Sequence, residues 1–452
     1  MVKIVLLLFC TLLPLYAKEF FTQEYIQRYL NDANPYYYSL KTHYYITQQK
    51  EQISRSAFDT RLQAVYEEKS YPLSSAHYSE ASFVKPLYNG MELGLQYRDA
   101  QGVQEYSNIK TGKDGEMAVS LKLPVISILT NRSTNAVNYE LSQLQTKVSN
   151  AKTGADITLL YKKVSINYFE LLYSHELFLL TQELFNKAKK RLLFIEKEVT
   201  LGNRASIELL DVKSQVITRE QKLLEARNIF LQSKNNFIKY LNLTQKEFDD
   251  KYQLPKIQPL KETLFSYQKY RDLAKRQRQE FQKIEYEKKK INEQQKGILL
   301  EQYPEFDIKL LGVHDIAYKK DGYKLSANFN FPLERNSYKG KKELFSRKKL
   351  RFNALQTILM NDINTDIDNL LNAIKMMQQK SNLSQQEIYL RQQLENAENI
   401  KYKEGLSNLV FINQRESRLL ESQQKRLQAL LKTHIYYLEL MYVTGDYTEG
   451  LK

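Results

Sequence analysis

The side chains that most often carry out chemistry are sparse in this sequence of 452 residues. Carboxylates are numerous, but they are spread along stretches with helical periodicity, and we find no glycine-rich phosphate loop and no nucleophile elbow. The sequence has one cysteine, Cys10, and five histidines, none of them at the spacing typical of metal ligands. The histidines are His43, His77, His175, His314 and His434. The sequence therefore predicts that the protein is not an enzyme, binds no metal and needs no cofactor.

The composition indicates long helices with few turns. The chain has 14 glycines and 9 prolines, well below the usual shares of about 7% and 5%. An α/β enzyme needs turns every dozen residues or so, and glycine and proline are the residues that make them. A mean hydropathy of −0.55 also argues against a protein made of many membrane-spanning helices.

The first 17 residues are predicted to be a secretory signal peptide rather than a membrane anchor. They combine a basic start at Lys3, an apolar stretch from Ile4 to Leu15, and the small residue Ala17 before a polar sequence. Cleavage would remove Cys10, so the mature chain would have no disulfide and no reactive thiol.

The net charge of +15 raises the possibility of nucleic-acid binding. The lysines and arginines, however, alternate with Glu and Gln along the helices, and no basic cluster is interleaved with aromatic residues. Because the chain is also predicted to be exported, we expect no nucleic-acid partner.

Two long helical hairpins are predicted. Residues 131–200 and 206–243 flank Gly202, and residues 341–402 and 409–443 flank Gly405. Apolar residues recur at steps of three and four, which is typical of a coiled-coil seam. Seventy helical residues would extend for about 105 Å, so each hairpin is a rod.

The recurrence of this plan predicts two internal structural repeats after the signal peptide at 1–17. The first repeat, 18–260, would hold an N-terminal helix, strands at about 57–123 and a hairpin at about 126–243. The second, 261–452, would hold a helix, strands at about 304–332 and a hairpin at about 340–443. The segment between them contains Pro255 and Pro259, which suit a connector.

Four segments before the long helices alternate between apolar and polar residues. They are 58–66, 117–123, 305–310 and 323–331. Strands of this kind, apolar on one face and polar on the other, are typical of a transmembrane β-barrel.

A fifth alternating segment, 91–98, leaves the strand count open. It either belongs to an extracellular hairpin or pairs with a further strand near 82–87, and we favour the hairpin.

Two strands per half give four per chain, whereas the smallest outer-membrane barrels have about eight. Three copies would supply twelve strands. The apolar seams of the long helices would be buried against the same neighbouring copies.

This combination resembles the outer membrane efflux protein family, the TolC-like channels. The resemblance covers nearly the whole mature chain and depends on the order of several short motifs. These are Asn34-Pro35, Leu121-Lys-Leu-Pro124, Ile166–Leu172, Leu201–Asp211, Phe329-Asn-Phe-Pro332, Tyr402–Leu409 and Tyr437–Gly445. Pro124 and Pro332 would mark the strand-to-helix junctions, where proline ends a strand and starts a helix.

The resemblance implies a mainly α protein with a membrane β-barrel portion. In this fold, coiled-coil hairpins of three copies form a periplasmic α-barrel that continues into a twelve-stranded β-barrel in outer-membrane lipid. It implies a homotrimeric exit duct of a tripartite efflux or type I secretion system. The hairpin turns, at Gly202, Gly405 and Leu406, would dock a periplasmic adaptor (membrane fusion) protein that connects to an inner-membrane pump. The cargo, whether drugs, metal ions or proteins, would be chosen by that pump.

The resemblance also places a gate at the periplasmic entrance. In related channels a Tyr three positions before the second turn's glycine helps to hold the closed state, and acids six and nine positions after that glycine can form a ring in the pore. Tyr402 matches that Tyr, and Glu208 and Asp211 keep the two acids in the first half. In the second half the matching positions hold Phe411 and Gln414.

This departure leaves the chemistry of the gate open between acidic and hydrophobic. Phe411 would either line a constriction that closes by steric and dewetting effects or pack between helices with Val410 and Ile412. Ser407 stands where some relatives carry a basic residue. The rival to a channel is a periplasmic coiled-coil adaptor or interaction protein, which would have one hairpin and a small β-rich domain.

Overall fold

The computed structural model of the chain describes residues 18–72, 74–102, 110–261 and 264–448. The predicted signal peptide, 1–17, lies outside the described residues. The chain forms two compact units, each made of segments from both halves of the sequence. The first unit comprises residues up to 39, 156–278 and those from 362 onward, and the second comprises 40–155 and 279–361.

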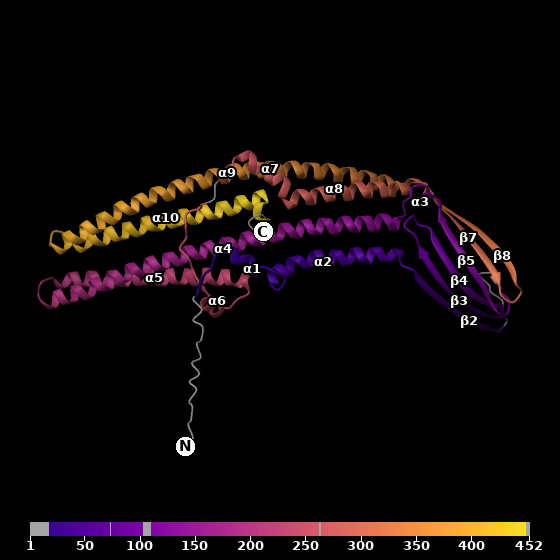
Figure 1. Cartoon of the computed structure of the whole chain (residues 1–452), viewed down its shortest axis with the longest axis horizontal. Helices are drawn as coiled ribbons and strands as arrows, with labels where there is room; N and C mark the ends of the chain where they lie inside the picture. The colour runs from indigo at the N-terminus through magenta and orange to yellow at the C-terminus, as the bar shows by residue number, and fades with distance from the viewer. Residues whose placement is uncertain (1–17, 73, 103–109, 262–263, 449–452) are drawn as a thin grey trace, which may run out of the picture. The chain divides into compact units, whose positions relative to one another are not determined.

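The four long helices occur where the sequence predicts them (Figure 1). Both hairpins have nearly the same dimensions, because the leading helices have 67 and 68 residues and the returning helices have 36 each. They are α4 (Thr134–Thr200), α5 (Ser206–Leu241), α9 (Asn336–Lys403) and α10 (Leu409–Thr444).

Side-chain caps fix where several helices begin. The Ser133 hydroxyl accepts a hydrogen bond from the Ala136 N–H at 3.1 Å before α4, and Asn408 caps α10 in the same way. Asn34 accepts from the Tyr36 N–H at 3.0 Å, ahead of Pro35 at the first helical position.

The shorter helices are α1 (Glu24–Tyr29), α2 (Pro35–Arg55), α3 (Val125–Leu129), α6 (Gln245–Lys251), α7 (Tyr267–Gln277), α8 (Gln279–Ile298), and the 3₁₀ turns η1 (Ser56–Phe58), η2 (Leu300–Gln302) and η3 (Asp446–Thr448).

An aromatic core holds the N-terminal segment inside the first unit. Phe21 is fully buried, with ring centroids 5.3 Å from Phe237 and 5.0 Å from Tyr252. Beside it, β1 (Glu19–Phe20) pairs in parallel with β6 (Tyr252–Gln253). Aromatic pairs in edge-to-face geometry contribute stability beyond that of the area that they bury, so this cluster fixes the segment around Phe21 against α5.

The second unit contains a six-stranded antiparallel sheet with the order β2-β3-β4-β5-β7-β8 (Figure 1). Each strand pairs with its neighbour along most of its length, and the sheet occupies the range in which the sequence predicts strands. The strands are β2 (Arg61–Tyr71), β3 (Ser74–Pro86), β4 (Glu92–Gly102), β5 (Glu116–Pro124), β7 (Glu305–Asp315) and β8 (Lys320–Asn330).

The expectation of only two strands in the first half is wrong. Within the described residues that half has four, because β3 pairs with β4 through Phe83 opposite Leu95. The alternative of a further strand near 82–87 is therefore the correct one. Ser75 and Ser79 occupy positions where an alternating strand would show apolar residues, which explains why the pattern missed β3. Twelve strands from three copies no longer follow from the strand count.

The two faces of the sheet differ sharply in chemistry. One face is apolar and exposed; Leu95, for example, has 60% of its surface exposed. A row of directly paired residues crosses this face on all six strands: Leu62, Phe83, Leu95, Val119, Gly312 and Tyr323. The other face is polar, and its rows include the directly paired residues Glu80, Arg98, Glu116, Asp315 and Lys320.

No helix within residues 18–72, 74–102, 110–261 and 264–448 has a stretch long and apolar enough to cross a membrane.

The junction prolines lie at the strand ends, but the long helices begin later. Pro124 is the last residue of β5 and precedes the short helix α3, after which α4 starts at Thr134. Pro332 follows β8, and α9 starts at Asn336. Asn131 and Arg335 adopt left-handed backbone conformations just before the long helices, so a turn separates each proline from its helix.

Candidate functional site

The turns that join the helices of each hairpin have the same backbone geometry. Gly202 and Gly405 both have φ of +77°, a conformation that favours glycine. The Gly405 N–H donates to the Tyr402 carbonyl at 3.1 Å, and the Leu406 N–H donates to the Lys401 carbonyl at 2.8 Å. The first hairpin repeats both bonds around Gly202. Both turns are Schellman motifs, which satisfy the last carbonyls of α4 and α9.

Tyr402 belongs to a small core beneath these turns that joins all four hairpin helices. Its side chain is buried, and the Arg204 guanidinium lies 4.6 Å from its ring centroid. Arg204 also bonds Glu208 at 2.8 Å. Burial raises the pKa of the Tyr402 phenol, so it is neutral at physiological pH. The residues packed in this core are Ile195, Val212, Tyr402, Leu409 and Ile412.

Phe411 and Gln414 are exposed and share one face of α10, because they are three positions apart. Phe411 keeps 49% of its surface exposed, whereas its neighbour Ile412 keeps 2%. Within a single chain Phe411 therefore does not pack into the core that buries Ile412. In the first hairpin Asp211 is exposed, while Glu208 forms an ion pair with Arg204.

Ser407 bonds the end of α9 to the second turn. Its hydroxyl donates to Glu398 at 2.6 Å, and Arg415 donates to the other oxygen of that carboxylate at 3.3 Å. The Ser407 hydroxyl and the Arg415 guanidinium lower the pKa of Glu398 below its ordinary value. The Ser407 side chain therefore forms its hydrogen bond inside the hairpin, and it is uncharged.

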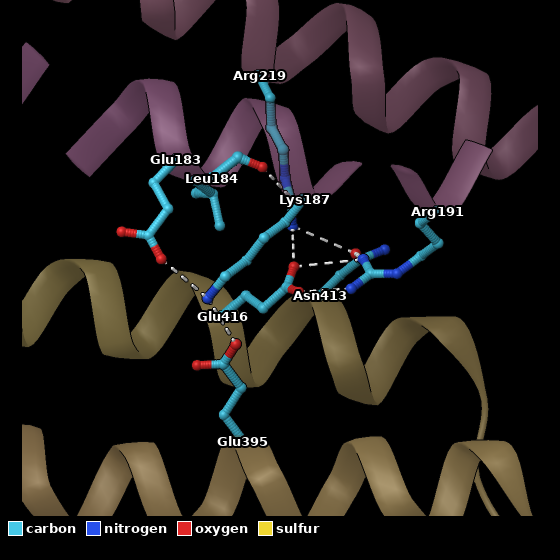
Figure 2. A network of polar contacts seen from close by, with 8 residues as sticks. All are labelled: Glu183, Leu184, Lys187, Arg191, Arg219, Glu395, Asn413 and Glu416. Atoms are coloured by element: carbon cyan, nitrogen blue, oxygen red, sulfur yellow. Dashed lines mark hydrogen bonds and ion pairs between the residues drawn. The ribbon is translucent and has the colours of Figure 1, made fainter. Parts of the chain in front are cut away.

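A buried ionic network lies further along the same four helices (Figure 2). Glu416 on α10 has 3% of its surface exposed. It accepts hydrogen bonds at 2.5 Å from Arg191 on α4 and at 2.5 Å from Arg219 on α5. Asn413 accepts from Arg191 at 3.0 Å, and Arg219 also donates to the Leu184 carbonyl at 3.2 Å.

The charges in this network change each other's ionisation. Burial alone would raise the pKa of Glu416, but Arg191 and Arg219 outweigh it and the net pKa is lowered. Burial lowers the pKa of the Arg219 guanidinium, against the opposing effect of Glu416. A buried carboxylate held by two guanidiniums with their hydrogen bonds made is strongly coupled to its partners.

A second ion pair extends the network to α9. Lys187 on α4 bonds Glu395 on α9 at 3.2 Å and lies 3.5 Å from Glu183 (Figure 2). Burial opposes the charge on Lys187, yet Glu395 outweighs it and raises the pKa of the amine. Together the two pairs connect the first hairpin to the second through both of its helices.

The structure brings together some of the residues expected at the site. Tyr402 and Glu208 meet at Arg204, whereas Asp211, Gln414 and Phe411 lie on exposed helix faces. The ionic network was missed. A signal was present, because Glu416 falls between the apolar seam positions Ile412 and Leu419, where a charge requires a partner.

Among the described residues, no group of three or more His, Cys, Asp or Glu side chains could hold a metal ion.

The chain was compared with known proteins, and no family model and no curated protein sequence matches it. Solved structures match closely in fold. The outer membrane protein VceC from Vibrio cholerae has a TM-score of 0.69 at 13% identity, covering 94% of this chain and 96% of that one. CusC, whose structures describe transmembrane channel formation, has a TM-score of 0.69 at 12% identity, with coverage of 96% and 95%. The MtrE outer membrane channel of Neisseria gonorrhoeae, in its open state, has a TM-score of 0.69 at 12% identity, with coverage of 94% and 88%. The chain therefore has the fold of TolC-like outer-membrane channels, as its sequence motifs suggested.

Proposed function

We propose that this protein is the outer-membrane channel of a tripartite efflux or type I secretion system. The observation that carries the proposal is the six-stranded sheet, which exposes an apolar face and keeps charged residues on the other. Such a division suits lipid on one side and water on the other. A soluble adaptor, the alternative, would leave that apolar face in contact with water.

The assembly is a homotrimer anchored in outer-membrane lipid, with the long hairpins extending into the periplasm. The hairpins belong to two internal repeats, 18–260 and 261–452. The two repeats are supported by the equal lengths of α5 and α10 and by the matching Schellman turns. The channel conducts passively, and a periplasmic adaptor and an inner-membrane pump supply energy and cargo.

The periplasmic entrance is formed by the hairpin ends. Phe411 and Gln414 line it from the second hairpin, and Asp211 does so from the first. Support comes from the exposure of all three and from the pairing of Glu208 with Arg204, which leaves the entrance less acidic than two free carboxylates would. The gate is therefore mainly hydrophobic.

The turns dock the adaptor through exposed apolar residues. Leu406 keeps 74% of its surface exposed, and Val410, one turn later, is also exposed. In the first hairpin Leu201 beside Gly202 and Ile207 are exposed in the same way. Exposed apolar side chains at the hairpin turns suit a protein contact.

The test is fractionation of cells that produce the protein, followed by native mass spectrometry of the detergent-extracted material and conductance measurements in planar bilayers. A trimer in the outer-membrane fraction that forms discrete channels is the expected result. A soluble periplasmic monomer without channel activity would overturn the proposal.

A further inference from the structure

The sheet of the second unit has two edge strands that its own chain leaves unpaired on one side. In the described part of the chain, β2 pairs only with β3, and β8 pairs only with β7. Both edges are 11 residues long. Because all five pairings are antiparallel, β2 and β8 run in opposite directions, as neighbouring strands of a further antiparallel pair would.

The two edges match in the chemistry of their faces. On the apolar face, β2 presents Leu62 and Ala64, and β8 presents Tyr323 and Leu325. The row that joins Leu62 to Tyr323 continues through the four inner strands, so pairing β8 with β2 of another copy would continue the apolar face from one copy to the next. A shift by one residue would place charged side chains on the apolar face.

The charges also match on the polar face. Glu67 lies toward the end of β2 that leads into the turn to β3, and Lys320 lies at the start of β8. Antiparallel pairing brings these two ends of the edge strands together. Opposite charges across an antiparallel pair favour it.

We propose that β8 of one copy pairs with β2 of the next copy, with all six strands of each copy in the wall. An edge left open in lipid would cost several kcal/mol for each unpaired backbone group, and six strands are fewer than the smallest membrane barrels contain. The number of copies rests on the proposed function. With three copies, the wall has eighteen strands instead of the twelve implied by two strands per half.

The additional strands change the size of the pore. Barrel diameter grows roughly in proportion to strand number, and barrels of 16–18 strands enclose an aqueous channel. An eighteen-stranded wall is about 1.5 times as wide as a twelve-stranded one. The difference comes from β3, which the alternating pattern missed, and from β4, whose alternation was assigned to an extracellular hairpin.

Cysteine cross-linking tests this arrangement, since the sequence has one natural cysteine, Cys10, in the predicted signal peptide. In outer-membrane vesicles, Ala64→Cys on β2 would be combined in turn with Tyr323→Cys, Leu325→Cys and Ala327→Cys on β8. A short thiol-reactive cross-linker should then give bands of two and three copies and nothing larger. As a control, Leu121→Cys with Leu310→Cys, which are paired within one chain, should cross-link without changing the apparent mass.

A second set of variants establishes whether β3 and β4 lie in the wall. Ala64→Cys with Ala81→Cys, and Tyr97→Cys with Met117→Cys, are direct partners in the structure and should cross-link within assembled trimers. Cross-linking of β2 directly to β5, tested with Ala64→Cys and Val119→Cys, would mean that β3 and β4 stand outside a twelve-stranded wall and would overturn the inference.

The outcomes separate this inference from the proposed function. A trimer by native mass spectrometry without β8–β2 cross-links would overturn the pairing and leave the channel intact. A monomer would contradict the channel itself. Glu67→Lys should weaken the trimer, and adding Lys320→Glu should restore it; a trimer indifferent to both changes would contradict the proposed charge pairing between the two edge strands.

Discussion

Glu416 divides its two carboxylate oxygens between guanidiniums from two other helices. Replacing it with alanine leaves Arg191 and Arg219 buried without their shared partner, and breaking such a pair costs about 3–5 kcal/mol. We expect Glu416→Ala to lower the thermal midpoint of helix unfolding, measured by circular dichroism of the purified protein. The control is Glu421→Ala, which removes an exposed i,i+4 pair with Lys425 and should change the midpoint little. Equal effects of the two substitutions would contradict a stabilising network.

The same carboxylate makes stability depend on pH. Its folded-state pKa is lower than the ordinary 4.5, chiefly because Arg191 and Arg219 outweigh its burial. The ion pair therefore stabilises the folded protein fully above about pH 4.5, and the contribution is lost as pH falls through the folded-state pKa. Thermal midpoints measured between pH 7 and pH 3 should fall less steeply for Glu416→Gln than for the natural protein. Parallel curves would show that other groups control the acid response.

Phe411 is the residue on which the proposed hydrophobic gate depends. Removing its ring should widen the constriction and ease wetting, so Phe411→Ala should raise single-channel conductance in planar bilayers. The control is Val410→Ala, a smaller apolar truncation at the next position on the helix, which should have less effect. Unchanged conductance, together with unchanged resistance of cells to large antibiotics, would mean that Phe411 packs between helices in the assembly.

The hairpin turns depend on a backbone conformation that side chains disfavour. A Cβ at Gly405 would meet nothing within 4 Å, so the cost of Gly405→Ala arises from its φ of +77° and should be about 1–2 kcal/mol. Gly340, inside α9, also has open space but no positive φ, and Gly340→Ala should stabilise the protein by about 0.5–1 kcal/mol. Opposite shifts of the unfolding midpoint are expected for the two variants. Shifts of the same sign would contradict this account of the turn.

The helical elements could be predicted from the sequence because their signals are local. A seam with steps of three and four, followed by Gly202 or Gly405, placed each hairpin within a few residues of its observed bounds. The sheet was predicted less completely. β8 alternates between apolar and polar residues, but β3 has Ser75 and Ser79 at positions where the alternation requires apolar residues. The pairing of β3 with β4 is a contact between strands, which a pattern within one segment does not encode.

The contacts of the site were harder to predict than its elements. Tyr402 and Glu208 were singled out, but Arg204, which lies between them, carries no pattern of its own. Arg191 and Glu416 are separated by 225 positions, and periodicity says nothing about which charge faces which. Single-sequence patterns therefore identified the helix faces and missed the pairs formed between hairpins.

In the proposed assembly, the hairpin ends dock a periplasmic adaptor. Leu406→Glu together with Val410→Glu places charges in the proposed docking surface and should abolish whichever export phenotype is lost when the gene is deleted. Outer-membrane location and trimer formation should stay unchanged. The control is Leu333→Glu, since Leu333 is 82% exposed but belongs to the other unit. Equal loss of export in the control would mean that added charge acts by a general defect.

The ionic network also has a consequence for the order of biosynthesis. Export proceeds from the N-terminus, and Glu416 is made 225 residues after Arg191 and 197 after Arg219. Until it emerges, two guanidiniums lack the carboxylate that offsets the cost of their burial, and this cost disfavours packing of the first hairpin around them. A prematurely terminated polypeptide would keep this region hydrated and open to proteases. The position of one late carboxylate thus delays the stable burial of Arg191 and Arg219 until the second hairpin has been made.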